Sequence, residues 1–134
     1  MSDGTSAVVV GYVPSPEGRA ALDAGVAEAR LRGARLVVVN TTRGDALVDD
    51  RYLAGDGLAE LRAELAALDV EAELRQPETY DDVADDLDAV ADEVGAELIV
   101  IGLRRRSPVG KLILGSAASR ILLTAHHAVL AVKA

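Results

Sequence analysis

Five short apolar runs, separated by longer segments with helical periodicity, constrain the fold of this chain more than any other feature. A short, continuous apolar run is typical of a strand that a sheet buries on both faces. Parallel strands need long crossover connections, and helices in the intervening segments can supply them. The alternation therefore predicts an α/β fold in which helices cover both faces of one open parallel sheet. The strands are expected at 7–12, 36–39, 70–74, 98–101 and 129–132.

The ends of the expected helices carry local signals. Ser15 fits an N-cap and Pro16 the first helical position, while Gly33 fits the end of the same helix. The polar, glycine-bearing stretch at 41–57 reads as a loop. Helices are expected at 16–33, 58–68, 79–95 and 115–124.

Composition narrows the class of protein. The 134 residues are expected to form a single domain, 1–134. Half of the residues are apolar but Phe and Trp are absent, so Ala, Val, Leu and Ile must build the core. The lack of cysteine excludes disulfides and cysteine metal ligands. A net charge of −8 argues against general affinity for nucleic acid or for an anionic membrane.

The beginning of the chain does not resemble a signal peptide. No apolar run approaches the roughly 18–20 residues that a membrane span requires. We therefore expect that the chain is not an integral membrane protein and that its location is cytoplasmic.

The glycine-rich stretch 99–116 follows the fourth expected strand and leads into the last helix. In open α/β sheets ligands bind beside the carboxyl ends of strands, and a helix N-terminus behind such a loop attracts phosphate. On this interpretation the backbone N–H groups of Gly115, Ser116 and Ala117 face phosphate oxygens. The alternative is that Gly102 and the later glycines serve only tight turns and close contact between helix and sheet.

Three consecutive arginines, 104–106, stand out in an acidic chain. A guanidinium is a bidentate phosphate donor, so this run suits an anion site. The alternative is a solvated loop whose arginines pair with acidic groups on the surface. As a DNA-binding patch the run is too short and has no adjacent aromatic residue for stacking.

No catalytic or metal site is expected from the remaining polar residues. Asp88 and Asp92 repel each other one helical turn apart, and we expect them on a solvated outer face rather than around a divalent ion. His126 and His127 are adjacent, so on an extended segment their side chains point to opposite faces and rarely share a metal. A role at the entry to the last strand is the better interpretation. No Ser-His-Asp set or carboxylate dyad supports hydrolysis.

The motifs together resemble the universal stress protein family along nearly the whole chain. The family's phosphate loop has a glycine, two residues, a second glycine, nine residues, a third glycine and then Ser or Thr. Gly102, Gly115 and Ser116 match three of those positions. The head of the chain at 8–17 and the tail at 120–132 match as well.

The resemblance implies a five-stranded parallel sheet of order 3-2-1-4-5, of the Rossmann-like adenine nucleotide alpha hydrolase type. It also implies a homodimer formed through the last strand, 129–132. Some family members bind ATP, so an adenine nucleotide is the expected ligand, with Mg²⁺ arriving only with the nucleotide and at most weak ATP hydrolysis. The nucleotide-binding residues implied by the resemblance are Gly11, Val13, Thr41, Ile101, Gly102, Arg105, Gly115, Ser116 and Ala117.

Two positions depart from the family's ATP pattern. ATP-binding members usually carry an aspartate where this chain has Val13, and Arg105 replaces the second glycine of the phosphate loop. Loss of one charge-assisted hydrogen bond costs roughly 1.5–3 kcal/mol of binding free energy. An interaction or anion-binding module of the same fold that does not bind a nucleotide is therefore the alternative function.

Overall fold

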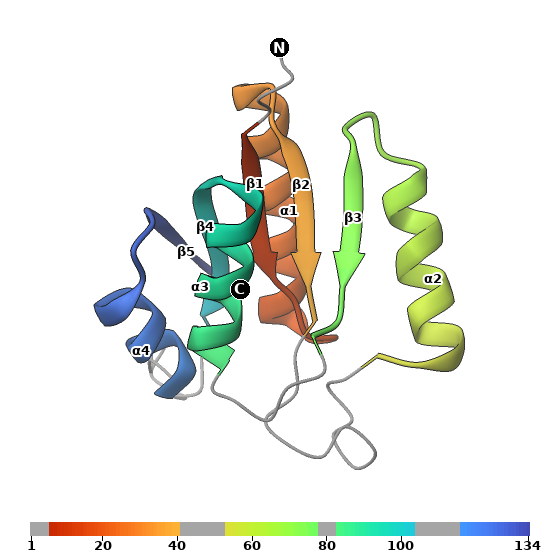
Figure 1. Ribbon diagram of the computed structural model, residues 1–134. Helices are drawn as coiled ribbons and strands as arrows, with labels where there is room; N and C mark the ends of the chain where they lie inside the picture. The colour runs from red at the N-terminus through yellow and green to blue at the C-terminus, as the bar shows by residue number, and fades with distance from the viewer. Residues whose placement is uncertain (1–5, 41–52, 78–82, 104–115) are drawn as a thin grey trace.

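The computed structural model describes residues 6–40, 53–77, 83–103 and 116–134 (Figure 1). Strands and helices alternate along the chain, as the sequence predicted. The elements in order are β1 (Ala7–Gly11), α1 (Pro16–Arg32), β2 (Arg35–Val39), α2 (Gly55–Ala66), β3 (Ala72–Arg75), α3 (Val83–Val94), β4 (Ala96–Leu103), α4 (Ser116–Thr124) and β5 (Val129–Lys133).

The five strands form one parallel sheet of order β3-β2-β1-β4-β5, which confirms the predicted fold class. Val9 of β1 pairs with Val37 on one side and with Ile99 on the other. Because all strands are parallel, their carboxyl ends meet at one edge of the sheet, at the bottom of Figure 1. We call this the carboxyl edge.

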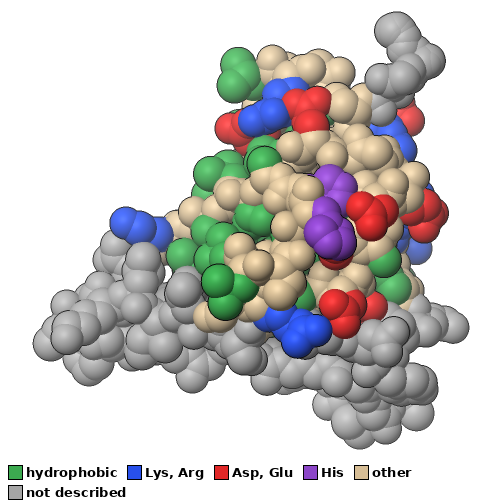
Figure 2. All heavy atoms as spheres, turned by 60° about the vertical axis from the view of Figure 1, so that its left-hand side comes forward, with side chains coloured by type: hydrophobic (Ala, Val, Ile, Leu, Met, Phe, Trp, Pro, Cys, Tyr) green, Lys and Arg blue, Asp and Glu red, His purple; other side chains and the backbone are tan. Residues whose placement is uncertain are grey.

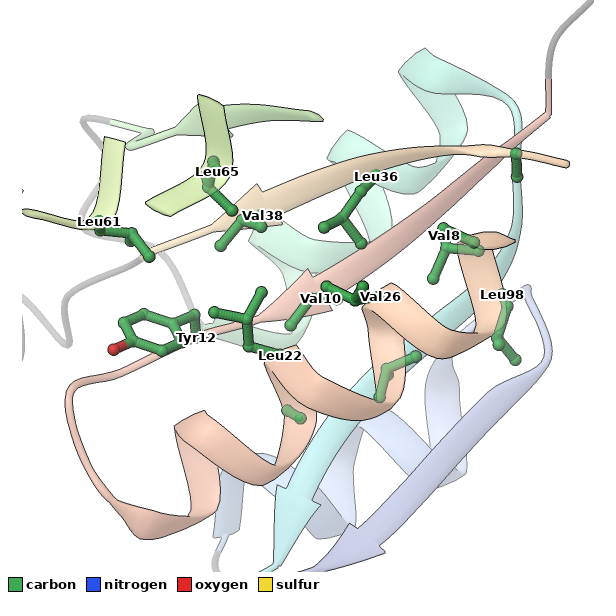
Figure 3. Packing of buried hydrophobic residues seen from close by; sticks show 14 residues of the cluster. Val8, Val10, Tyr12, Leu22, Val26, Leu36, Val38, Leu61, Leu65 and Leu98 are labelled. Carbon is green, nitrogen blue, oxygen red and sulfur yellow. The ribbon is translucent and has the colours of Figure 1, made fainter. Parts of the chain in front are cut away.

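The core consists of two apolar layers, one on each face of the sheet. Val8 and Val10 of β1 point toward α1 and α2, whereas Val9 points toward α3 and α4. Figure 3 shows the first layer, in which Leu22 of α1 packs against β1 and Leu65 of α2 lies over β2. Successive residues of β1 point to opposite faces and both faces are covered by helices, which explains why β1 is a continuous apolar run rather than an alternating one.

The sequence signals for the two ends of α1 are confirmed by the structure. The Ser15 side-chain oxygen accepts a hydrogen bond from the Gly18 N–H at 3.1 Å, so Ser15 is the predicted N-cap. Gly33 follows the helix with φ of 64°, a conformation that glycine adopts at little cost.

Some boundaries differ from the sequence prediction. The fourth strand was expected at 98–101 but spans Ala96–Leu103, because pairing with β5 continues as far as Leu103 and Lys133. The second helix was expected from residue 58 but begins at Gly55. The opening of the third helix, expected at 79–82, lies outside the described residues.

None of the helices in the described ranges combines the length and the apolar composition needed to cross a membrane.

Candidate functional site

The carboxyl ends of β1 and β4 meet at the point where the strand order reverses. The chain runs from β1 to β2 and β3 on one side, while β4 and β5 lie on the other side. In open α/β sheets a ligand binds outside the carboxyl ends at such a switch point. The candidate site is therefore built from the residues that follow β1, β2 and β4 and from the helices that begin at this edge.

Gly11 and Ile101 are neighbours at the ends of β1 and β4 on the face covered by α3. The Ile101 side chain is buried in the core, and a Cβ atom on Gly11 would lie 3.7 Å from its Cγ2. The same atom would lie 3.1 Å from Cδ1 of Leu87. The structure thus brings these two predicted site residues together, and a larger residue at Gly11 would displace Leu87.

Gly102 and Val13 both contact the first turn of α1. A Cβ atom on Gly102 would overlap the backbone carbonyl of Glu17, and one on Gly18 would overlap the backbone carbonyl of Val13. The start of α1 therefore packs backbone to backbone against the end of β4 and against the segment after β1. Both glycines are required by this close approach, as the alternative interpretation of Gly102 proposed. The Val13 side chain is half-buried at the same place.

Asn40, at the end of β2, is a buried polar residue that the sequence analysis did not single out. Its amide nitrogen donates to the Tyr12 carbonyl at 3.0 Å. Its side-chain oxygen accepts from the Leu53 N–H at 2.8 Å and from the Gln76 amide at 3.0 Å. Asn40 therefore ties the segments after β1 and β3 to Leu53, two residues before α2. The available signal was a single polar residue directly after the apolar run of β2.

The start of α4 differs from the other helix starts in its charge. The first turns of α1, α2 and α3 each contain at least one acidic residue, whereas the first turn of α4 contains none. The N–H groups in the first turn of a helix have no partner within the helix, and they favour an anion. Among the described helices, α4 therefore offers the first turn best suited to a phosphate.

The cationic side chain at the start of α1, Arg19, is already engaged. Arg19 donates to both carboxylate oxygens of Glu64, at 2.5 and 3.0 Å. The hydrogen bond from Arg19 holds the pKa of Glu64 below its ordinary value, although burial opposes this shift. The same hydrogen bond raises the pKa of Arg19. This guanidinium thus joins α1 to α2.

The remaining predicted site residues are described only in part. Ala117 is half-buried in the first turn of α4, and Ser116 opens that helix. Thr41, Arg105 and Gly115 lie outside the described residues.

Comparison with known proteins agrees with this architecture. The model of the universal stress protein family matches residues 5–133. A universal stress protein of Mycolicibacterium smegmatis is 47% identical over 126 residues, which cover 94% of this chain and 96% of that protein.

Two solved structures have the same fold. One is the universal stress protein from Archaeoglobus fulgidus in complex with dAMP, which is 26% identical in sequence. The match has a TM-score of 0.64 and covers 95% of this chain and 96% of that chain. The other is a universal stress protein in complex with cAMP, 25% identical with a TM-score of 0.64 and coverage of 96% and 97%. The family match and the 47% identity lead to one conclusion. This chain belongs to the universal stress protein family.

Proposed function

We propose that the chain binds an adenine nucleotide, ATP with its Mg²⁺, at the carboxyl edge. The phosphates lie at the start of α4, and the base lies between the ends of β1 and β2. The observation that carries the proposal is the first turn of α4, which has no acidic residue and begins at the edge where the strand order reverses. Two relatives with this fold were solved with adenine nucleotides, dAMP and cAMP, which supports the class of ligand.

The walls of the proposed base site are apolar or already hydrogen-bonded. Val13 presents an apolar, half-buried side chain where ATP-binding members usually carry an aspartate. The Asn40 amide is engaged with Tyr12 and Leu53, so it shapes this wall. Adenine recognition in this chain therefore depends on packing and on backbone groups, and affinity is expected to be weaker than in members with the aspartate.

The first experiment compares thermal unfolding of the chain in MgATP, AMP, cAMP and inorganic phosphate with Mg²⁺. A ligand at 100 times its dissociation constant stabilises the folded chain by about 2.7 kcal/mol. We expect stabilisation by the adenine nucleotides that exceeds stabilisation by phosphate. Absence of any shift with all three nucleotides would overturn the proposal.

A charge variant in α4 tests the position of the phosphates. Ala117→Asp places a carboxylate in the first turn, where it suits the helix dipole but repels a bound phosphate. We expect nucleotide affinity to fall at least about 10-fold. Ala117→Asn has nearly the same shape without the charge and is the matched control. Equal affinity of the two variants would contradict the placement of phosphate at α4.

The alternative function is an anion-binding or interaction module of the same fold, which Val13 favours because it removes the usual polar contact. This alternative predicts equal stabilisation by phosphate and by nucleotide. Hydrolysis is expected to be weak at most, and the cytoplasmic location stays a prediction.

We also propose that the chain forms a homodimer through β5. Within the sheet β5 pairs only with β4, so its other side is an edge. That edge is apolar from Val129 to Val132. Leu123 of α4 is 84% exposed, and apolar side chains gather on this side of the molecule (Figure 2). An apolar edge strand is a liability unless another strand covers it.

A further inference from the structure

Imidazole and carboxylate groups converge where the turn before β5 meets α3. Figure 2 shows both histidines of the chain, in purple, side by side and next to acidic side chains. The groups are His126 and His127 of the turn and Asp88 and Asp92 of α3. We call them the His–Asp cluster. Their place at the start of β5 puts them at the opposite end of that strand from the carboxyl edge.

The donor atoms of the cluster lie close to one another. Nδ1 of His126 is 3.0 Å from Oδ2 of Asp88, and Nδ1 of His127 is 3.3 Å from Oδ1 of the same residue. Nε2 of His127 is 3.3 Å from Oδ1 of Asp92. One donor atom from each of Asp88, Asp92 and His127 can be chosen so that all lie within 4.8 Å of one another.

The backbone around the histidines explains why both rings reach the same aspartate. The sequence analysis expected an extended segment with the rings on opposite faces, and this expectation was wrong. Residues 126 and 127 form a bend, and the His126 N–H donates to Oδ1 of Asp88 at 3.1 Å. Asp88 and Asp92 are one helical turn apart, so their carboxylates lie on the same side of α3.

The cluster brings two carboxylates together, one of them shielded from solvent and the other, Asp92, 60% exposed. The side chains of Asp88 and His127 are only 19% and 16% exposed. Burial alone would raise the pKa of Asp88, but hydrogen bonds from the His126 backbone and the His127 ring hold that pKa below its ordinary value. A divalent cation carries the charge that would neutralise both carboxylates at one point.

We propose that Asp88, Asp92 and His127 bind one divalent transition-metal ion, with water in the fourth position. Imidazole and carboxylate donors suit Zn²⁺. Zinc–nitrogen and zinc–oxygen bonds of about 2.0–2.2 Å place the ligand atoms of a tetrahedral site about 3.4 Å apart. One donor atom each of Asp88, Asp92 and His127 already lies within 4.8 Å of the others, so small side-chain movements would bring the three to that spacing. The bound ion would fix the start of β5 to α3.

Titration calorimetry of the full chain with ZnCl₂, without nucleotide, tests the proposal. We expect one ion per chain with a dissociation constant in the micromolar range or below. Co²⁺ in place of Zn²⁺ should give the visible absorption of a tetrahedral site. Because an imidazole must be deprotonated to bind a metal ion, affinity should fall as the pH is lowered.

Variants separate the metal site from simple ion pairs. Asp92→Asn and His127→Gln each remove one ligand and should weaken Zn²⁺ binding more than about 100-fold. Asp85→Asn is the matched control, because Asp85 is an exposed residue of α3 that lies 3.6 Å from Arg120. It should leave Zn²⁺ affinity unchanged. Thermal unfolding without metal checks that each variant is folded.

Several results would overturn the proposal. One is the lack of any binding at roughly millimolar Zn²⁺, and another is equal weakening by Asp85→Asn and Asp92→Asn. One ion per two chains would place the metal between copies rather than within the cluster. All of these results are independent of nucleotide binding, because the cluster and the carboxyl edge are at different ends of the sheet.

Discussion

Gly102 lies under the first turn of α1, and its place in the phosphate motif does not by itself explain why it is a glycine. A Cβ atom there would overlap the backbone carbonyl of Glu17, which cannot move as a side-chain end could. Packing therefore fixes this position whether or not a nucleotide binds. Retention of the first motif glycine is thus weaker support for a ligand than the charge pattern of α4.

The first prediction concerns Gly102→Ala. Because the added methyl group meets backbone, we expect a loss of roughly 1–3 kcal/mol in the free energy of unfolding. Gly57→Ala in α2 is the matched control, since its Cβ atom would lie 3.4 Å from Leu53 in an ordinary contact. This control should leave the free energy of unfolding unchanged or raise it by up to about 1 kcal/mol. Urea unfolding measures both, and an unchanged Gly102→Ala protein would contradict the packing argument.

At the residue scale, prediction from sequence succeeded where a local signal existed. Ser15 and Gly33 have the roles that their residue types favour at helix ends. Asn40 was missed because its partners come from three segments that are distant in sequence. The contacts of His126 and His127 with Asp88 were missed because they depend on a bend in the backbone, which the residue pattern did not predict.

Helix α2 is joined to α1 by the ion pair of Arg19 and Glu64, which is the clearest polar contact between elements on that face. The hydrogen bond from Arg19 lowers the pKa of Glu64 in the folded chain below the ordinary value of 4.5. The unfolded chain therefore binds a proton at Glu64 more readily. The stabilisation is present above about pH 4.5 and is lost as the pH falls through the lower folded pKa.

The second prediction concerns Glu64→Gln. Both side chains are more than two-fifths exposed, so the pair contributes at most about 1 kcal/mol near neutral pH. The variant should be less stable than the parent at about pH 7, and the difference should vanish toward about pH 3. Glu60→Gln, an exposed carboxylate of the same helix, is the control. Urea unfolding across this pH range measures the difference, and a loss that persists in acid would contradict the ion-pair explanation.

At the element scale, each strand and helix in the described residues was predicted from the sequence, while the boundaries depended on tertiary pairing. The apolar run of β4 ends before Gly102, but hydrogen bonding with β5 extends the strand to Leu103. The order of the strands came from the family resemblance, because periodicity does not say which strands are neighbours. The edge position of β3 was predicted from its short, more polar sequence, and its residues are half-buried at the edge of the sheet.

At the scale of the whole molecule, the two edges of the sheet have opposite chemistry. The β3 edge carries Glu73 and Arg75, which pair with each other. The β5 edge is apolar from Val129 to Val132. Charged residues on an edge strand discourage pairing with another chain, and an apolar edge favours it. The proposed dimer should therefore use β5 and leave β3 exposed.

Backbone direction provides the test of that dimer. In a parallel ladder, alternate residues turn their N–H and C=O groups to the same neighbour. The Ala128 carbonyl and the Ala134 N–H both bond to β4, so the Ala131 N–H points to the open edge. On β3 the carbonyls of Glu71 and Arg75 bond to the β2 side, so the Ala72 N–H points away from the sheet.

The third prediction compares Ala131→Pro with Ala72→Pro. Each substitution removes one outward N–H without removing a bond to the neighbouring strand. Ala131→Pro should convert the dimer to a monomer at micromolar concentration, whereas Ala72→Pro should leave the dimer intact. Light scattering after size-exclusion chromatography measures the mass, and circular dichroism checks that both variants are folded. A monomeric parent chain would contradict the dimer itself. A dimer that survives Ala131→Pro would contradict an interface at β5, and loss of the dimer in Ala72→Pro would place the interface at β3.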